Sequence, residues 1–276
     1  MFDKIKKVLL RIMPSSIAGR LRAWRIRRLI DSYSPRVVEH EYGNNRFKVY
    51  LADPLAQGWY DNDWTELPEI TLLRTSKLQP GARVFDIGAH QGVVALMLAS
   101  EVGTSGQVVA VEPSPHNCAA ALKNQDLNGA VQMEVIQAAV SEKTGTLSFG
   151  RGLNGQIDDG TGARGQFDVD STTIDALAIR FGMPDLVFID VEGAEHLALE
   201  GAYRVLQTDA DFFVEVHVGY GLEKLGGSVE KVLSYFPQER YSLVGRAEAD
   251  KEFRLLTMAD HLFSDRFFLI ARRKRS

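Results

Sequence analysis

Acidic residues stand at or near the ends of several apolar segments of this chain, where a folded α/β sheet presents side chains to ligands. The sharpest case is VFDIGAHQG (84–92), in which an apolar strand runs into the pattern Asp-x-Gly-x-x-x-Gly and then into a helix. Gly88 lets the backbone turn tightly and approach a ligand, and Gly92 lets the following helix pack closely. A dinucleotide-binding turn would read Gly-x-Gly-x-x-Gly and hold a pyrophosphate. Here Asp86 takes the first position, and its carboxylate suits a cationic ligand that carries an amino group.

A second acid lies one strand–helix–strand passage further on. Glu112 ends the strand VVAVE (108–112), 26 residues after Asp86. A carboxylate at such a strand end can accept hydrogen bonds from both ribose hydroxyls of a nucleoside cofactor. Each acid alone has a structural interpretation, as part of a strand-to-helix turn or as a solvated strand end. Together they favour S-adenosylmethionine over a nicotinamide dinucleotide.

Two acids and a histidine follow the next apolar strands. Asp190 and Glu192 come after Leu186–Ile189, and they could orient an acceptor or shield a sulfonium charge. The alternative is an acid-rich helix start, which the helix dipole also favours. His217 follows the next strand and could take the proton of a hydroxyl, although a lone histidine is more often structural. Asp190, His217 and Glu192 are therefore the candidate catalytic residues, whereas Glu195 is interpreted as structural.

Other kinds of function stay open at this point. Asp190, Glu192 and His217 are ligand types that could hold Mg²⁺ in a metal-assisted methyltransferase, although we assign no metal ligand. A non-catalytic scaffold that binds S-adenosylmethionine would keep Asp86 and Glu112 but would need no base. Release of S-adenosylhomocysteine separates enzyme from scaffold, and sensitivity to EDTA separates metal from base catalysis.

Nucleic acid is not expected as a substrate. Residues 31–271 hold 19 basic and 35 acidic residues, whereas a nucleic-acid enzyme needs a basic surface around its site. The segment Asp190-Val191-Glu192 lacks the Pro-aromatic pair that would stack on a flipped base. The only cysteine, Cys118, lies early in a helix where it can pack, which disfavours a cysteine nucleophile. A single cysteine also excludes a disulfide within the chain and fits a cytoplasmic protein.

The order and spacing of these motifs resemble the FkbM family of S-adenosylmethionine-dependent methyltransferases. The resemblance covers roughly residues 65–245. The matching pieces are VFDIGAHQG (84–92), VVAVEPSPHN (108–117), AAVSEKTGTLSF (138–149), STTIDAL (171–177), DLVFIDVEGAEHLALEGA (185–202) and FFVEVHVG (212–219).

The resemblance implies a Rossmann-like class I methyltransferase fold and O-methylation of a hydroxyl on a sugar, a glycan, a glycolipid or a secondary metabolite. It also implies a set of cofactor-binding residues. That set is Asp86, Gly88, Gly92, Glu112 and Asn117, with Ala139 near the adenine, and we add the adjacent Ala89, His90 and Pro113. Ser141 stands where the family frequently has an acid, which puts adenine contacts there in doubt.

Hydrophobic patterns divide the chain into three parts. We expect a basic helical extension (1–35), a hairpin and helix that lead into the core (36–80), and a Rossmann-like methyltransferase domain (81–276). In the third part, strand-length apolar runs alternate with helical segments, which predicts a mostly parallel sheet with helices on both faces.

Local patterns add further expectations. Alternating residues around Gly43 predict a hairpin over 36–52, and a helix is expected over 63–77. Six glycines within 150–165 predict an irregular, mobile loop that closes over the acceptor. The longest purely apolar run, Val93–Ala99, is too short to span a bilayer.

The N-terminal extension is strongly basic. Residues 1–30 carry nine Lys or Arg residues and one acid, and they are expected to form two short helices separated at Pro14. They could dock onto the acidic body of the same chain, or lie on an anionic membrane as a peripheral arm. In the second case these apolar side chains would enter the interface: Phe2, Ile5, Leu9, Ile12 and Trp24. The sequence makes no prediction of oligomeric state.

Overall fold

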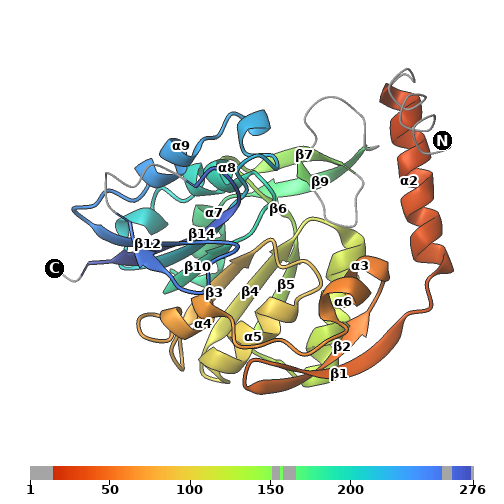
Figure 1. Ribbon diagram of the computed structural model, residues 1–276, viewed down its shortest axis with the longest axis horizontal. Coiled ribbons are helices and arrows are strands. Elements are labelled where there is room, and N and C mark those ends of the chain that lie inside the picture. The colour runs from red at the N-terminus through yellow and green to blue at the C-terminus, as the bar shows by residue number, and fades with distance from the viewer. Residues whose placement is uncertain (1–14, 151–155, 158–165, 257–262, 275–276) are drawn as a thin grey trace.

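The computed structural model describes residues 15–150, 156–157, 166–256 and 263–274, and its centre is one large sheet (Figure 1). Within the described residues this sheet has eight strands, in the order β13-β12-β14-β11-β10-β3-β4-β5. The bounds are β3 (Arg83–Ile87), β4 (Gln107–Glu112), β5 (Met133–Gln137), β10 (Leu186–Ile189), β11 (Asp211–Val216), β12 (Tyr241–Ala247), β13 (Arg254–Leu255) and β14 (Phe267–Arg273).

The central strands are apolar on both faces, as strands covered by helices must be. All four residues of β10 are buried, and so are the last four residues of β3. β3, β4, β5, β10 and β11 pair in parallel, whereas β14 runs antiparallel between β11 and β12. The carboxyl ends of the parallel strands therefore meet at one edge of the sheet.

Helices cover both faces of this sheet (Figure 1). Because side chains alternate along a strand, Val84 belongs to the core on one face and Phe85 to the core on the other. The first core takes α5 (Val93–Val102) and α6 (Pro115–Asn128), and the second takes α7 (Ile174–Phe181), α8 (Glu195–Glu200), α9 (Val229–Ser234) and the 3₁₀ helix η1 (Val205–Gln207). A further 3₁₀ helix, η2 (Glu223–Leu225), precedes α9. The prediction of a mostly parallel sheet with helices on both faces is confirmed.

The predicted hairpin is present and packs on α6. β1 (Arg36–Tyr42) and β2 (Asn45–Leu51) are joined by a turn at Gly43, which has a φ of +63°. The backbone N–H of Tyr50 donates to Asn124 Oδ1 at 2.6 Å, which ties the hairpin to the helix.

Asp53 joins this hairpin to a helix that the sequence analysis missed, α3 (Pro54–Tyr60). Its Oδ1 accepts the first N–H groups of α3, as an N-cap residue does. Its Oδ2 accepts a hydrogen bond from Gln91 Nε2 at 2.7 Å and lies 2.8 Å from His116 Nε2. Because Asp53 is fully buried, it fixes α3 against the turn that contains Gln91.

The segments around α3 differ from the expectations. The predicted helix over 63–77 is reduced to α4 (Pro68–Leu73), because a proline disfavours helical geometry in the residue before it and Leu67 is extended. The N-terminal extension shows one continuous helix, α2 (Ser15–Ser32), while residues 1–14 lie outside the described residues. Among the described helices, none is long and apolar enough to cross a membrane.

A smaller sheet was not predicted. Its described strands run in the order β6-β9-β7-β8, with bounds β6 (Ala139–Val140), β7 (Gly145–Gly150), β8 (Gln156–Ile157) and β9 (Gln166–Thr172). β8 pairs with the end of β7, so the expectation of a wholly irregular loop over 150–165 is wrong at Gly150 and at Gln156–Ile157. The rest of that loop, 151–155 and 158–165, lies outside the described residues, and its closure stays a prediction.

Candidate active site

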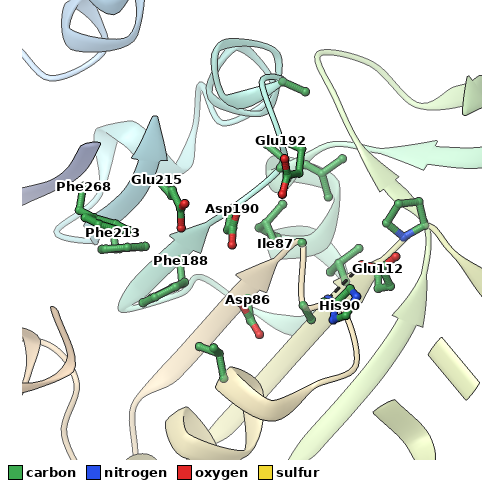
Figure 2. Close-up of a pocket in the computed structure, with 18 of the residues that line it drawn as sticks. Asp86, Ile87, His90, Glu112, Phe188, Asp190, Glu192, Phe213, Glu215 and Phe268 are labelled. Atoms are coloured by element: carbon green, nitrogen blue, oxygen red, sulfur yellow. Dashed lines mark hydrogen bonds between the residues drawn. The ribbon is translucent and has the colours of Figure 1, made fainter. Parts of the chain in front are cut away.

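The carboxyl ends of the central strands border a cavity of about 530 Å³, a size typical of small-ligand sites. In Figure 2, phenylalanine side chains lie toward one end of the cavity and Glu112 toward the other, with Asp86 and Asp190 between them. The predicted site residues that line it are Asp86, Gly88, Ala89, His90, Glu112, Pro113, Ala139, Asp190 and Glu192. The cavity lining does not include the other predicted residues, Gly92, Asn117 and His217.

Asp86 and Gly88 form a cradle at the end of β3. Asp86 is 2 % exposed, and its Oδ2 has no hydrogen-bond partner among the described residues. A buried carboxylate oxygen in this state is costly unless a ligand donates to it. Gly88 has a φ of +94°, and a Cβ there would lie 1.7 Å from the carbonyl oxygen of Asp190. The cradle fits the cationic amino end of S-adenosylmethionine.

Glu112 is held in a fixed orientation by three donors. Its Oε1 accepts the N–H of Ser114 at 2.9 Å and the Asn117 amide at 3.2 Å, and its Oε2 accepts the N–H of His90 at 3.0 Å. Burial raises the pKa of Glu112 to about 7, although these donors favour its charged form. Burial, together with the nearby charge of Glu112, raises the pKa of Asp86 to about 7 as well. Both carboxyl groups therefore sit where a cationic ligand would favour ionisation.

Gly92 and Asn117 support the cavity wall from behind. A Cβ at Gly92, which has a φ of +78°, would lie 2.9 Å from Met133 Cε and 3.0 Å from Ala121 Cβ. The glycine therefore lets α5 and α6 pack closely, as the sequence analysis also expected. Asn117 acts on the cavity through Glu112, to which it donates.

Asp190 and Glu192 lie in a tight turn after β10. The N–H of Asp190 donates to the carbonyl of Ile87 at 2.8 Å, which holds this turn against the end of β3. Glu192 has a φ of +53°, uncommon for a residue with a side chain. A Cβ on Gly193 would lie 2.6 Å from the carbonyl carbon of Gly221, so the turn requires glycine there. The two carboxylates are thereby presented to the cavity by rigid backbone.

Asp190 is the acid of this turn that is most open to the cavity. Its side chain is 41 % exposed, against 21 % for Glu192. Although its side chain is open to the cavity, the protein that encloses the cavity desolvates the carboxyl group, and this desolvation and the nearby charge of Glu215 raise the pKa of Asp190 well above its usual range. A carboxyl group with a raised pKa can take up a proton.

His217 lies behind these carboxylates. Its side chain is 2 % exposed, and its Nδ1 lies 2.7 Å from Oε1 of Glu195, a fully buried acid. Burial disfavours the imidazolium, but the hydrogen bond to Glu195 and the charges of Glu195, Asp190 and Glu192 raise the pKa of His217 to about 9. Glu195 also accepts the N–H of Gly193 at 2.8 Å. Glu195 thus orients the histidine. The sequence analysis interpreted Glu195 only as a structural residue and did not predict this contact.

The far end of the cavity is aromatic. The rings of Phe188 and Phe213 stack with centroids 3.9 Å apart, and Phe213 stacks with Phe268 at 6.1 Å. Beside them, Arg266 Nη1 lies 3.0 Å from Oε1 of Glu215. Flat apolar faces next to charged groups suit a ring that has both an apolar face and polar substituents.

The end of α3 closes the cavity near Glu112. Tyr60 is buried, and its hydroxyl lies 2.9 Å from Nδ1 of His90. Trp59 packs beside the same histidine, with ring centroids 5.1 Å apart. His90 adopts a φ of +48°, so its side chain leaves the turn toward these aromatic residues.

Sequence reasoning missed several residues of this cavity. Phe188 and Phe213 were assigned only to core strands, yet each precedes a cavity acid, Asp190 or Glu215, by two residues. Because side chains two apart on a strand share a face, this spacing is a signal that could have placed them in the site. Tyr60 carries no comparable signal, since its position depends on the packing of α3.

Comparison with known proteins adds independent information. The family model of the methyltransferase FkbM domain matches residues 86–243, more than half of the chain. None of the curated proteins compared with the chain matches it.

Several methyltransferases of known structure are similar to this chain at low sequence identity. One is a methyltransferase FkbM from Methylobacillus flagellatus (19% identity, 68% of this chain and 43% of that chain, TM-score 0.45). Another is a SAM-dependent methyltransferase from Aquifex aeolicus (18% identity, 79% and 93%, TM-score 0.43). A third is a SAM-dependent O-methyltransferase from Thermotoga maritima (13% identity, 91% and 82%, TM-score 0.45). The match spans less than half of the Methylobacillus flagellatus chain.

This protein is a Rossmann-like class I methyltransferase. The conclusion rests on the sheet order, in which β3 lies between β4 and β10, and on the family match. The chain belongs to the FkbM methyltransferase family, and its cofactor is S-adenosylmethionine. The fold, the family and the cofactor expected from the sequence are confirmed.

Proposed function

We propose that this methyltransferase methylates a hydroxyl group on a sugar, a glycan, a glycolipid or a secondary metabolite. The observation that carries the proposal is the placement of the Asp190 and Glu192 carboxylates in the same cavity as Asp86 and Glu112. An aliphatic hydroxyl benefits from a group that favours loss of its proton during transfer, and carboxylates can provide this. When bound, S-adenosylmethionine supplies an activated methyl group on its sulfonium.

The cofactor would be held at the Glu112 end of the cavity. Asp86 would accept the amino group, and Glu112 the ribose hydroxyls, while the backbone at Gly88 allows close approach. Ala89, His90, Pro113 and Ala139 would complete this wall. The acceptor would then occupy the end lined by Phe188, Phe213 and Phe268, whose flat faces suit the apolar face of a ring.

Asp190, and not His217, would contact the reacting hydroxyl. Asp190 lines the cavity, whereas His217 is 2 % exposed and is outside the lining. His217 would instead position Asp190 and Glu192, to which its Nε2 lies at 3.6 and 3.7 Å. Positioning of the acceptor supplies most of the rate in such a transfer, since roughly 7–11 kcal/mol is available from orientation.

A panel of acceptors tests the proposed function. Purified protein would be incubated with S-adenosylmethionine and with sugars, glycolipids and hydroxylated secondary metabolites. S-adenosylhomocysteine release would be measured and the product analysed by mass spectrometry and NMR. The proposal expects a methyl group on oxygen, and a methyl group on nitrogen or carbon would contradict it.

Binding of S-adenosylmethionine is expected to weaken as the pH falls. With pKa values of about 7 in the free protein, Asp86 and Glu112 are largely protonated at pH 6, and a protonated acid attracts a cation less. Calorimetry should therefore give a dissociation constant at least about tenfold larger at pH 6 than at pH 7.5, since one acid of pKa about 7 alone accounts for that factor. Replacing Asp86 by Asn should reduce both the affinity at pH 7.5 and its pH dependence. An affinity that stays constant across this range in the wild-type protein would contradict the assignment.

We also propose that the enzyme is cytoplasmic and that α2 makes it membrane-peripheral by contacting an anionic membrane surface. Trp24 and Leu29 are 54 % and 51 % exposed on a helix that projects beyond the body in Figure 1, among arginines that include Arg25 and Arg28. Among the described side chains of α2, Arg27 forms an ion pair with Asp31 of the same helix.

Sedimentation with phosphatidylserine-containing vesicles tests this contact. Each basic residue near an anionic surface strengthens binding, so exchanging Arg25, Arg27 and Arg28 for Gln should weaken it by at least about tenfold. Vesicles of phosphatidylcholine alone serve as the control. If the wild-type protein binds neither kind of vesicle, docking onto its own acidic body becomes the better account.

A further inference from the structure

A buried imidazole nitrogen faces three carboxylates at the edge of the cavity. Nε2 of His217 lies 3.6 Å from Asp190 Oδ1, 3.7 Å from Glu192 Oε2 and 3.6 Å from Glu215 Oε1. These three acids are called the carboxylate cluster below. Nε2 has less than 1 Å² of exposed surface and no hydrogen-bond partner within the part of the chain that the structure describes.

The distances around Nε2 are too long for hydrogen bonds, which need about 2.7–3.2 Å between nitrogen and oxygen. They match the separation of atoms that share an ion instead. Ligands placed about 2.1–2.3 Å from one cation lie roughly 3–3.8 Å from each other. One ligand atom each from Asp190, Glu192 and His217 can be chosen so that all lie within 4.8 Å of one another.

The orientation of the imidazole also suits metal binding. Glu195 is 0 % exposed, and its Oε1 receives the N–H of Nδ1 at 2.7 Å. With the hydrogen on Nδ1, the lone pair of Nε2 points toward the carboxylate cluster. A carboxylate that accepts the second N–H of a ligating histidine is the usual outer partner in protein metal sites.

We infer that Asp190, Glu192 and His217 bind a divalent metal ion at the edge of the cavity, between Glu112 and the phenylalanine end (Figure 2). Glu215 would flank this ion rather than ligate it fully, because Arg266 already neutralises it at 3.0 Å. Carboxylates suit Mg²⁺ and Mn²⁺, and an imidazole ligand shifts the preference toward Mn²⁺. An ion at this place would occupy the position otherwise open to a proton on Nε2.

The metal site deepens the proposed hydroxyl methylation. Binding of the ion does not depend on that proposed function, but the role of the ion in the reaction rests on it. Asp190 and Glu192 line the cavity, so an ion that they hold would be open to an acceptor oxygen. A hydroxyl bound to a divalent ion loses its proton more readily, and the proton would pass to the neighbouring Glu215 carboxylate or to water. The carboxylate cluster and the histidine would thereby act as one unit.

Binding of Mn²⁺ can be measured without any acceptor. Untagged protein freed of metal would be titrated with MnCl₂, and the electron paramagnetic resonance signal of free Mn²⁺ followed. The expected result is one site per chain, with competition by Mg²⁺. His217→Gln and Asp190→Asn should each weaken binding by at least about tenfold, and Glu195→Gln by less, because its side-chain oxygen can still accept from Nδ1.

Glu248→Gln is the matched control, because Glu248 also lines the cavity but pairs with Arg266 and not with His217. It removes one negative charge from the same cavity and should leave Mn²⁺ affinity unchanged. Calorimetry of S-adenosylmethionine binding verifies that each variant is folded.

The inference is overturned if the wild-type protein shows no Mn²⁺ site below millimolar concentrations, or if His217→Gln binds Mn²⁺ as the wild type does. If binding is absent while the acceptor panel gives an O-methylated product that EDTA does not suppress, the proposed function stands with Asp190 acting directly. If Mn²⁺ binds but methylation occurs on nitrogen or carbon, the metal site stands and the proposed function fails.

Discussion

Replacing Asp190 by asparagine is expected to lower kcat by about 10²–10⁴-fold. Asparagine keeps the shape of the side chain, but it can neither take a proton nor hold a cation with a negative charge. The loss should appear in kcat and not in binding of S-adenosylmethionine, because the proposed cofactor acids are Asp86 and Glu112, and Glu112 lies at the end of the cavity away from the phenylalanines (Figure 2). S-adenosylhomocysteine release with the acceptor identified by the panel measures kcat, and calorimetry measures cofactor affinity.

Asp185→Asn provides the matched control for this result. Asp185 precedes β10, the strand that Asp190 follows, and its Oδ2 accepts the N–H of Arg83 at 2.9 Å. The same substitution is thus made at the opposite end of one strand, away from the cavity, where the asparagine oxygen can still accept. The Asp185→Asn variant should keep the kcat of the wild-type protein. Full turnover by Asp190→Asn would show that the hydroxyl needs neither a base nor a metal at this position.

The sequence predicted the parallel strands well because their signals are local. Arg83–Ile87 is a short, mostly apolar run that contains Asp86 and precedes Gly88, and Leu186–Ile189 is an apolar run that precedes Asp190 and Gly193. The structure gives both strands with the same bounds. The sequence alone therefore places the acids near such strand ends at one edge of the sheet. The fold class followed from the same alternation.

Among the elements that were not predicted, β7 and β9 lack a local signal, whereas α3 carries one that was not used. β7 and β9 are rich in Gly, Ser, Thr and Asp, and they pair across a long insertion. Nothing in the local pattern gives that register. α3 did carry a signal, since Asp53 followed by Pro54 is a typical N-cap and first helical residue.

The candidate site also has a part that the sequence indicates and a part that depends on the tertiary structure. Residue types near strand ends indicated Asp86, Glu112 and Asp190, but they could not indicate which acid touches His217. The contact of His217 with Glu195 depends on how α8 packs against the end of β11, which is a property of the tertiary structure. Burial of the histidine was equally beyond the sequence, and it is burial that separates a positioning role from contact with the acceptor.

Gly88→Ala is expected to abolish measurable cofactor binding and to lower Tm by on the order of 10 °C. The new methyl carbon would lie 1.7 Å from the carbonyl oxygen of Asp190, and this backbone cannot retreat, because the N–H of Asp190 donates to Ile87 at 2.8 Å. β3 and β10 would have to separate at their carboxyl ends, which displaces Asp86 from one side of the cavity and Asp190 from the other. Calorimetry and thermal unfolding measure the two effects.

Gly129→Ala separates this clash from the general cost of a left-handed backbone. Gly129 has a φ of +58°, but a Cβ there has no atom within 4 Å, so alanine should cost only about 1 kcal/mol and leave cofactor affinity unchanged. The difference between the two variants isolates the contact between Gly88 and Asp190. If both variants lose the same stability and bind S-adenosylmethionine equally well, the turn at Gly88 does not couple the cofactor end of the cavity to Asp190. In that case the two halves of the site would have to be positioned independently of each other.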